Sequence, residues 1–161
     1  MIKKQILDAI SMNSRRSTED LAAMLNTGTD TIEHEIKEME DNKVICGYPT
    51  LINWDRTDCE KVTALIEVKV TPQRDMGFNK VAERIYKFEE VESVYLMSGG
   101  YDLSVTVTGH TFKEVAMFVA KRLSTLDSVV STATHFVLRR YKDDGVLFLG
   151  EKKDERSPGI Q

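Results

Sequence analysis

Alternating apolar and polar residues mark the middle of the chain, over residues 91–109 (VESVYLMSGGYDLSVTVTG). A period of two with many β-branched residues is typical of strands that bury one face, and it predicts two strands joined at Gly99-Gly100. Because glycine has no Cβ, this joint leaves backbone N–H groups open to each other or to a small ligand. Asp102 follows directly, and its carboxylate either closes the turn or faces a ligand.

The same pattern extends this pair of strands into a domain. Residues 62–70 and 129–140 alternate as strands, the last one with an extension at 146–149. Residues 78–85 and 112–123 instead carry apolar side chains at helical spacing. The order strand–helix–strand–strand–helix–strand predicts an α+β, ferredoxin-like domain. Two helices cover only one sheet face, so we expect the other face, with exposed Val, Ile and Leu side chains, to pair in a homodimer.

Three short stretches with helical spacing precede this domain, at residues 2–12, 18–25 and 30–40. Ser17 has Asp20 three residues later, which indicates a helix N-terminus, and Thr29 or Asp30 is expected to cap the third helix. The tight glycine-containing turn between the second and third helices predicts a helix-turn-helix. Residues 44–48 have the composition of a short strand, which would form a wing.

These patterns divide the chain into four parts. Residues 1–50 are expected to form a winged helix-turn-helix domain, and residues 51–61 a linker. Residues 62–149 are expected to form the ferredoxin-like domain. Residues 150–161 are charged and lack apolar periodicity, which predicts a flexible tail.

Composition narrows the class of protein. With 161 residues, 41% of them hydrophobic, the chain is long enough to bury a sizeable core. The net charge of −4 gives no bulk basicity, and no apolar run approaches the roughly 18 residues of a membrane span. Cys46 and Cys59 lack metal-ligand spacing, and the three histidines are scattered. We therefore expect a cytoplasmic protein with reduced thiols, no metal and no cofactor.

Three motifs follow one another along the chain. They are VICGY at 44–48, GGYDL at 99–103 and STATHFVLRRYK at 131–142, the last preceded by DSV at 127–129. Together they resemble signatures of the Lrp/AsnC (feast/famine) family of transcriptional regulators. That family has Val-Ile-x-Gly-Tyr at the end of its DNA-binding domain, a Gly-x-Tyr-Asp turn, and a last strand ending in Val-Leu-x-x-Tyr-Lys. The resemblance covers nearly the whole chain, up to about Leu149.

The resemblance implies a regulator that responds to an amino acid or a related metabolite. Family members form homodimers through the αβ domains, often assemble further into homo-octamers, and bind effectors between dimers near the glycine turn. The implied effector-binding residues are Ser98, Gly99, Gly100, Tyr101, Asp102, Thr132 and Thr134. Turn amides suit an α-carboxylate, and a carboxylate suits an ammonium group. The two threonines are open to a second interpretation, as ordinary strand residues.

The resemblance also implies binding to double-stranded DNA by the first domain. The implied contact residues are Lys3, Lys4, Arg15, Arg16, Thr29, Thr31, His34, Lys37 and Lys43. Arg15 or Arg16 matches the arginine that the family has before its second helix. Thr29, Thr31 and His34 are also compatible with capping or simple solvent exposure.

The third helix departs from the family pattern. Residues 30–41 carry six acids and a single base, Lys37, for a net charge of −5. Family members usually have an arginine at the position of Glu35, so Glu35→Arg is expected to raise affinity for DNA of any sequence. Two alternatives stay open: a metabolite-sensing oligomer with little DNA binding, and an enzyme similar to the sirohaem decarboxylases. His110 and His135 are the candidates for the enzyme and form no recognisable constellation, so we expect no catalytic activity.

Overall fold

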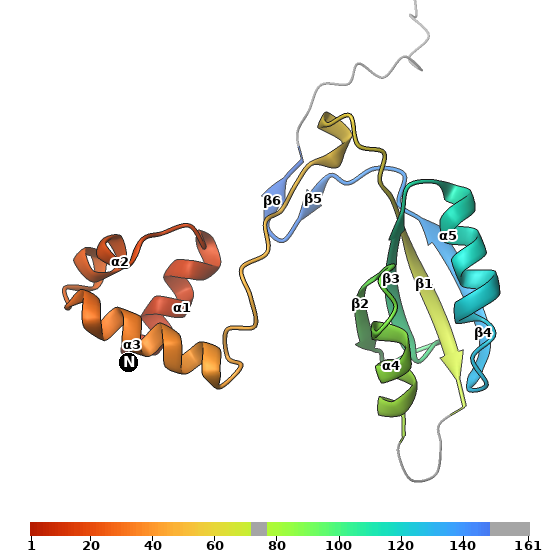
Figure 1. Ribbon diagram of the computed structural model, residues 1–161, viewed down its shortest axis with the longest axis horizontal. Coiled ribbons are helices and arrows are strands. Elements are labelled where there is room, and N and C mark those ends of the chain that lie inside the picture. Colours follow the sequence, from red (N-terminus) through yellow and green to blue (C-terminus); the bar gives the residue numbers. More distant parts are fainter. Residues whose placement is uncertain (72–76, 149–161) are drawn as a thin grey trace, which may run out of the picture. The chain divides into compact units, whose positions relative to one another are not determined.

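The computed structural model describes residues 1–71 and 77–148. They fold into two compact units, the first from Met1 to Ile52 and the second from Asn53 onward (Figure 1). Residues 72–76 and 149–161 lie outside the described residues. The end of the expected strand extension at Leu149 and the expected flexible tail over 150–161 therefore fall outside the description.

Three helices make up the first unit: α1 (Ile2–Met12), α2 (Thr18–Leu25) and α3 (Thr29–Asp41). Their apolar stripes meet in one core of buried side chains, formed by Ile6, Leu21, Ala22, Ile32, Met39 and Ile45. The first five lie at the helical spacing that the sequence shows, because a stripe repeating every three to four residues stays on one side of a helix, and Ile45 joins them from the segment after α3.

The helix termini in this unit differ in how they are capped. The Ser17 hydroxyl accepts a hydrogen bond from the Asp20 N–H at 3.1 Å, as the sequence predicts for the start of α2. The prediction for α3 is wrong, because Gly28 occupies its N-cap position and no side chain caps it. Between the two helices, Asn26 turns the chain with a φ of 50°.

A capping turn ends α3, and no wing strand follows it in the described residues. The Val44 and Lys43 N–H groups bond to the Met39 and Glu40 carbonyls at 2.8 and 3.0 Å, and Lys43 has a φ of 58°. This is the Schellman arrangement, which satisfies the last carbonyls of a helix. Among the described residues no strand forms over 44–48, because Ile45 is drawn into the helical core.

Tyr48 fastens the segment after α3 to the helix. Its hydroxyl donates to the Glu40 carboxylate at 2.8 Å. Partial burial and this hydrogen bond raise the pKa of Tyr48 to about 12. Because the residue remains 45% exposed, the hydrogen bond, which needs the phenolic proton, is the firmer of the two causes.

Tyr48→Phe is therefore expected to change the alkaline behaviour of the protein. A raised pKa means that Tyr48 contributes stability below its ordinary value near 10, and that this stability is lost as pH rises toward 12. Absorbance of phenolate near 295 nm should show a step near pH 12 that is absent from Tyr48→Phe. The free energies of unfolding of the wild type and Tyr48→Phe should converge as pH rises from 10 toward 12. A difference between them that does not change with pH would show that the Glu40 contact contributes nothing.

The second unit is built on an antiparallel four-stranded sheet. After a short helix η1 (Trp54–Arg56), its elements are β1 (Val62–Val70), α4 (Asn79–Tyr86), β2 (Val91–Leu96), β3 (Leu103–Gly109), α5 (Phe112–Phe118), η2 (Val119–Leu123) and β4 (Val129–Phe136). The strand order in the sheet is β2-β3-β1-β4. The chain is thus of the α+β class, with β1 and β3 in the interior of the sheet.

One face of this sheet is covered by α4 and α5 (Figure 1). The buried side chains of β1 and β3 are Ala64, Ile66, Val68, Val70, Leu103, Val105 and Val107. They pack against Val81 and Ile85 of α4 and Val115 of α5. The alternation in the sequence is explained by this one-sided burial.

The other sheet face is more polar than the sequence led us to expect. Thr63, Glu67 and Lys69 of β1 point to it. Thr63 and Glu67 stand opposite Thr108 and Ser104 of β3, and Lys69 stands opposite Ser131 of β4. The Val, Ile and Leu side chains that were expected to be exposed here mostly face the helices instead. Leu65 and Tyr95, 46% and 61% exposed, are the large apolar side chains that this face presents among the described residues.

The C-terminal strand is shorter than predicted. β4 ends at Phe136, and Val146 and Leu147 do not extend it. Instead β5 (Lys142–Asp143) pairs with β6 (Val146–Leu147) in a separate hairpin. Asp144 and Gly145, with φ values of 45° and 79°, form its two-residue turn, which is the turn type that matches strand twist.

Candidate functional site

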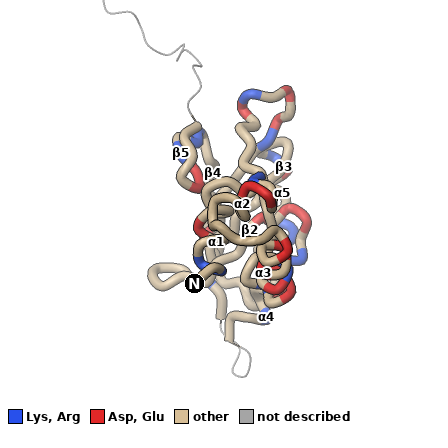
Figure 2. The backbone as a smooth tube through the Cα atoms, turned by 90° about the vertical axis from the view of Figure 1, so that its left-hand side faces the viewer, with Lys and Arg blue, Asp and Glu red and all other residues tan. Residues whose placement is uncertain are grey.

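The outer surface of α3 holds most of the predicted DNA-contact residues of that helix. Thr31, His34 and Lys37 are exposed, and Thr29 is half-buried at the first turn. The helical repeat places Asp30, His34, Lys37 and Asp41 on the side opposite the buried Ile32. Figure 2 shows how acidic residues follow one another along this helix. Lys37 lies 3.3 Å from Asp41, so its charge is already paired within α3.

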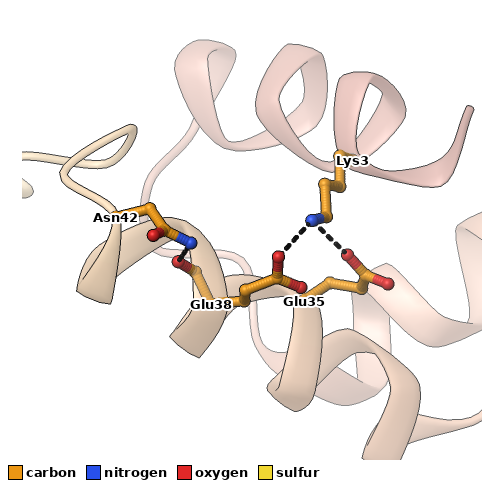
Figure 3. Close-up of polar contacts among 4 residues, drawn as sticks. All are labelled: Lys3, Glu35, Glu38 and Asn42. Carbon is orange, nitrogen blue, oxygen red and sulfur yellow. Dashed lines mark hydrogen bonds and ion pairs between the residues drawn. The ribbon is translucent and has the colours of Figure 1, made fainter.

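Lys3 of α1 reaches two carboxylates on the inner side of α3 (Figure 3). Its Nζ donates to Glu38 Oε1 at 2.8 Å and lies 3.6 Å from Glu35 Oε2. The hydrogen bond raises the pKa of Lys3 and lowers the pKa of Glu38, because each charge favours the other. Glu35 is only 19% exposed. Glu35, which stands at the family's arginine position, and Glu38 are thus turned toward α1 and share one lysine.

The remaining basic residues of the first unit divide into exposed and packed ones. Lys4, Arg15 and Lys43 are exposed. Arg16 is half-buried, with Nη1 at 3.1 Å from the Met24 sulfur. Lys4, Arg15, Arg16 and Lys43 are thus the predicted lysines and arginines that no ion pair within residues 1–71 and 77–148 engages, and of these Lys4, Arg15 and Lys43 are exposed.

The glycine turn between β2 and β3 is open. Ser98, Gly99 and Gly100 are exposed, and Tyr101 is half-buried. Gly99 has a φ of 148°, a conformation that side-chain-bearing residues rarely adopt, and an added Cβ at either glycine would meet nothing within 4 Å. A small ligand can therefore approach the backbone of this turn closely. The structure thus requires glycine for its backbone conformation at position 99, whereas Gly100 adds only open space beside the backbone.

Asp102 has a partner that the sequence did not suggest. Its Oδ2 accepts a hydrogen bond from the Val70 N–H at 2.9 Å, and its own N–H donates to the Val68 carbonyl at 3.1 Å. The Asp102 carbonyl accepts from the Met97 N–H at 2.8 Å. The residue thus closes the turn and also binds the end of β1, next to the point where the β1–β4 register shifts between Lys69 and Val70.

Thr132 and Thr134 lie on the helix-covered side of the sheet. They stand opposite Val68 and Ile66 of β1, whose side chains are buried under the helices. The Thr132 and Ser124 hydroxyls are 3.1 Å apart, which ties β4 to the end of η2. Since β1 lies between β4 and β3, backbone spacing puts Thr132 on the order of 10 Å from Asp102.

Other predicted chemistry is not assembled in the part of the chain that the structure describes. His135 lies 3.4 Å from Glu67 on the polar sheet face, and His110 is exposed after β3. Within residues 1–71 and 77–148, no three His, Cys, Asp or Glu side chains are grouped to hold a metal ion. No described helix has both the length and the apolar character needed to cross a membrane.

Comparisons with known proteins bear on both units. The Lrp/AsnC ligand binding domain matches residues 63–147. Over 153 residues, 94% of this chain and 92% of the relative, the chain is 51% identical to YugG, an uncharacterised HTH-type transcriptional regulator of Bacillus subtilis (strain 168).

Solved structures share the fold across both units. The structure of E. coli AsnC matches with a TM-score of 0.65 and 20% identity, covering 86% of this chain and 91% of that one. The regulator NMB0573 of Neisseria meningitidis, solved as an L-Met complex, matches with a TM-score of 0.70 and 20% identity, covering 88% and 91%.

Proposed function

The chain belongs to the Lrp/AsnC family of transcriptional regulators, and we propose that it binds double-stranded DNA through its first unit and an amino acid through its second. The observation that carries the proposal is the open glycine turn, residues 98–102, inside the segment that matches the ligand binding domain. The L-Met complex of the Neisseria relative supports an amino acid as the effector class.

The two units have the architecture that this function needs. Strand order β2-β3-β1-β4 with α4 and α5 on one face supports a ferredoxin-like effector domain. The α2–turn–α3 arrangement supports a helix-turn-helix that carries its recognition residues on α3, although the described residues lack the wing strand. We further propose that the protein works in the cytoplasm, without a cofactor or a catalytic activity, as do regulators that only bind.

At the turn, the proposed contacts follow from group chemistry. The exposed backbone of Ser98, Gly99 and Gly100 offers N–H groups to the effector α-carboxylate, and the two glycines carry no Cβ that would obstruct its approach. One Asp102 oxygen is used by Val70, and the other is proposed to accept from the effector ammonium. Tyr101 and the β4 residues Thr132 and Thr134 are proposed to complete the pocket once copies assemble.

Assembly is part of the proposal. Four strands with helices on one side leave the polar face of β1 and β3 uncovered, and a second copy placed face to face would bury Leu65 and Tyr95. A homodimer, with a homo-octamer as the larger form, is the proposed state. Light scattering at micromolar concentration should therefore give at least twice the mass of one chain.

A metabolite-sensing oligomer with little DNA affinity is the second candidate, and the acidic outer surface of α3 favours it. Selection of bound fragments from random DNA, with and without a panel of amino acids, separates the two. The first candidate predicts enrichment of one sequence class, and affinity that falls steeply with salt. The second candidate predicts that no DNA fragment is enriched, while calorimetry with the same panel still shows one amino acid bound.

A further inference from the structure

His34 lies on the exposed side of α3, among the residues that are proposed to meet DNA. Asp30 stands about one turn before it and Lys37 about one turn after it on the same side of the helix. Within residues 1–71 and 77–148, no hydrogen bond or ion pair engages the His34 imidazole. The imidazole is thus accessible and has no fixed partner in this part of the chain.

The rest of this side of α3 offers DNA no unpaired cation within the described residues. Lys37 is the single base of residues 30–41, and its Nζ lies 3.3 Å from the Asp41 carboxylate. Residues 30–41 carry a net charge of −5 with His34 neutral and −4 with His34 protonated. Histidine is the side chain that ordinarily changes charge between about pH 5 and 8. His34 therefore decides whether this surface presents a free cation to a phosphate near neutral pH.

Besides Asp30 and Lys37, the charged groups near His34 are Glu38 of α3 and Lys3 of α1. Glu38 stands one turn after His34 and accepts a hydrogen bond from Lys3 at 2.8 Å (Figure 3). Lys3 holds the pKa of Glu38 below its usual value, and the charge of His34 adds a smaller effect in the same direction. α2 packs on the buried side of α3 and contributes no ion pair to it within residues 1–71. Because Lys3 already pairs with Glu38, the charge of a protonated His34 remains available to DNA.

From this position and these pairings, we propose that His34 is a proton-dependent phosphate contact, through which the protein binds DNA more tightly as pH falls from about 8 to about 6. The inference rests on the proposed binding of DNA by the first unit. At the higher pH the imidazole is neutral, and the acids of α3 repel the phosphates. The added proton supplies one positive charge and a second ring N–H donor.

Protons and DNA act on each other through this residue. Coupling between two bound species is reciprocal, so a proton that strengthens DNA binding is itself bound more tightly in the complex. The phosphates provide the physical cause, because a nearby negative charge favours the protonated imidazole. Binding of DNA near neutral pH is therefore accompanied by uptake of protons from the solvent. The acidic α3 thus becomes a surface that depends on pH for its affinity, in addition to the proposed amino-acid effector.

Fluorescence anisotropy of a labelled DNA duplex of random sequence, titrated with the full chain at constant ionic strength, measures the effect. Between about pH 8 and about pH 6, the wild type is expected to gain about three- to tenfold in affinity for each protomer in contact. The dependence of log affinity on log salt should steepen by about 0.9 for each protomer over the same range. His34→Gln cannot be protonated, so it should keep the weaker affinity at both pH values. His34→Lys should bind at the higher pH at least as tightly as the wild type binds at the lower one.

The matched control is His110→Gln, which removes an exposed histidine of the second unit and should keep the pH dependence of the wild type. Calorimetry in two buffers of different protonation enthalpy should show proton uptake on DNA binding that is smaller in His34→Gln. Salt-dependent binding with the same pH dependence in the wild type and His34→Gln would overturn the role of His34 and leave the proposed DNA binding standing. Absence of binding by the wild type and by His34→Lys at every pH would overturn both.

Discussion

A lysine in place of Glu33 is expected to raise the affinity of the protein for DNA several-fold at moderate salt. Glu33 is exposed on α3, and no ion pair holds it within the described residues. Replacing it removes one repulsion from the phosphates and adds one attraction. The dependence of log affinity on log salt should steepen by about one unit for each protomer in contact. Mobility-shift titrations across a salt series measure both quantities.

Two controls make this result specific to the face of α3. Asp127→Lys makes the same change of charge at an exposed position of the second unit and should leave the salt slope unchanged. Glu35→Arg changes charge on the inner side of α3, where it would place a second cation beside Lys3. The structure thus revises the expectation for that variant, from a simple gain of affinity to a gain offset by weaker α1–α3 packing. A Glu33→Lys slope equal to that of the wild type would mean that this face does not approach DNA.

Periodicity was a sufficient guide to most of the fold. The helices and the four sheet strands lie close to where the apolar spacing placed them, because burial of one face is what such spacing encodes. The end of β4 and the wing were mispredicted for one reason. At 44–48 and after residue 136, apolar β-branched residues take structural roles other than extending a strand. Ile45 completes the helical core, and Val146 pairs in a hairpin with a two-residue turn.

The candidate sites were harder to foresee because they depend on pairs that are far apart in sequence. Lys3 and Glu38 are 35 residues apart, and Val70 and Asp102 are 32 residues apart. No local pattern encodes such contacts. Counting charges along α3 correctly showed its acidity, yet it could not show that two of the glutamates face α1.

Asp102→Ala is expected to destabilise the second unit by about 1.5–3 kcal/mol, the scale of a lost hydrogen bond to a charged group. The variant removes the acceptor of the Val70 N–H, which is left partly buried at the end of β1. Asp102→Asn keeps an acceptor of the same size, so it should retain most of that stability. Urea unfolding of the full chain compares the two, with exposed Asp127→Ala as the control that should match the wild type.

The same pair of variants separates two roles of Asp102: its hydrogen bond to Val70 at the end of β1, and its proposed contact with the effector ammonium. Anchoring needs an acceptor oxygen, whereas an effector ammonium needs a negative charge, so Asp102→Asn removes only the second property. We expect it to lose roughly tenfold or more in affinity for the amino acid identified by calorimetry, while its unfolding midpoint stays near that of the wild type. Unchanged affinity in Asp102→Asn would confine Asp102 to the Val70 contact. The glycine amides alone would then remain as the proposed contact to the effector, since their approach depends on the φ of Gly99 and on the missing Cβ atoms and not on the carboxylate.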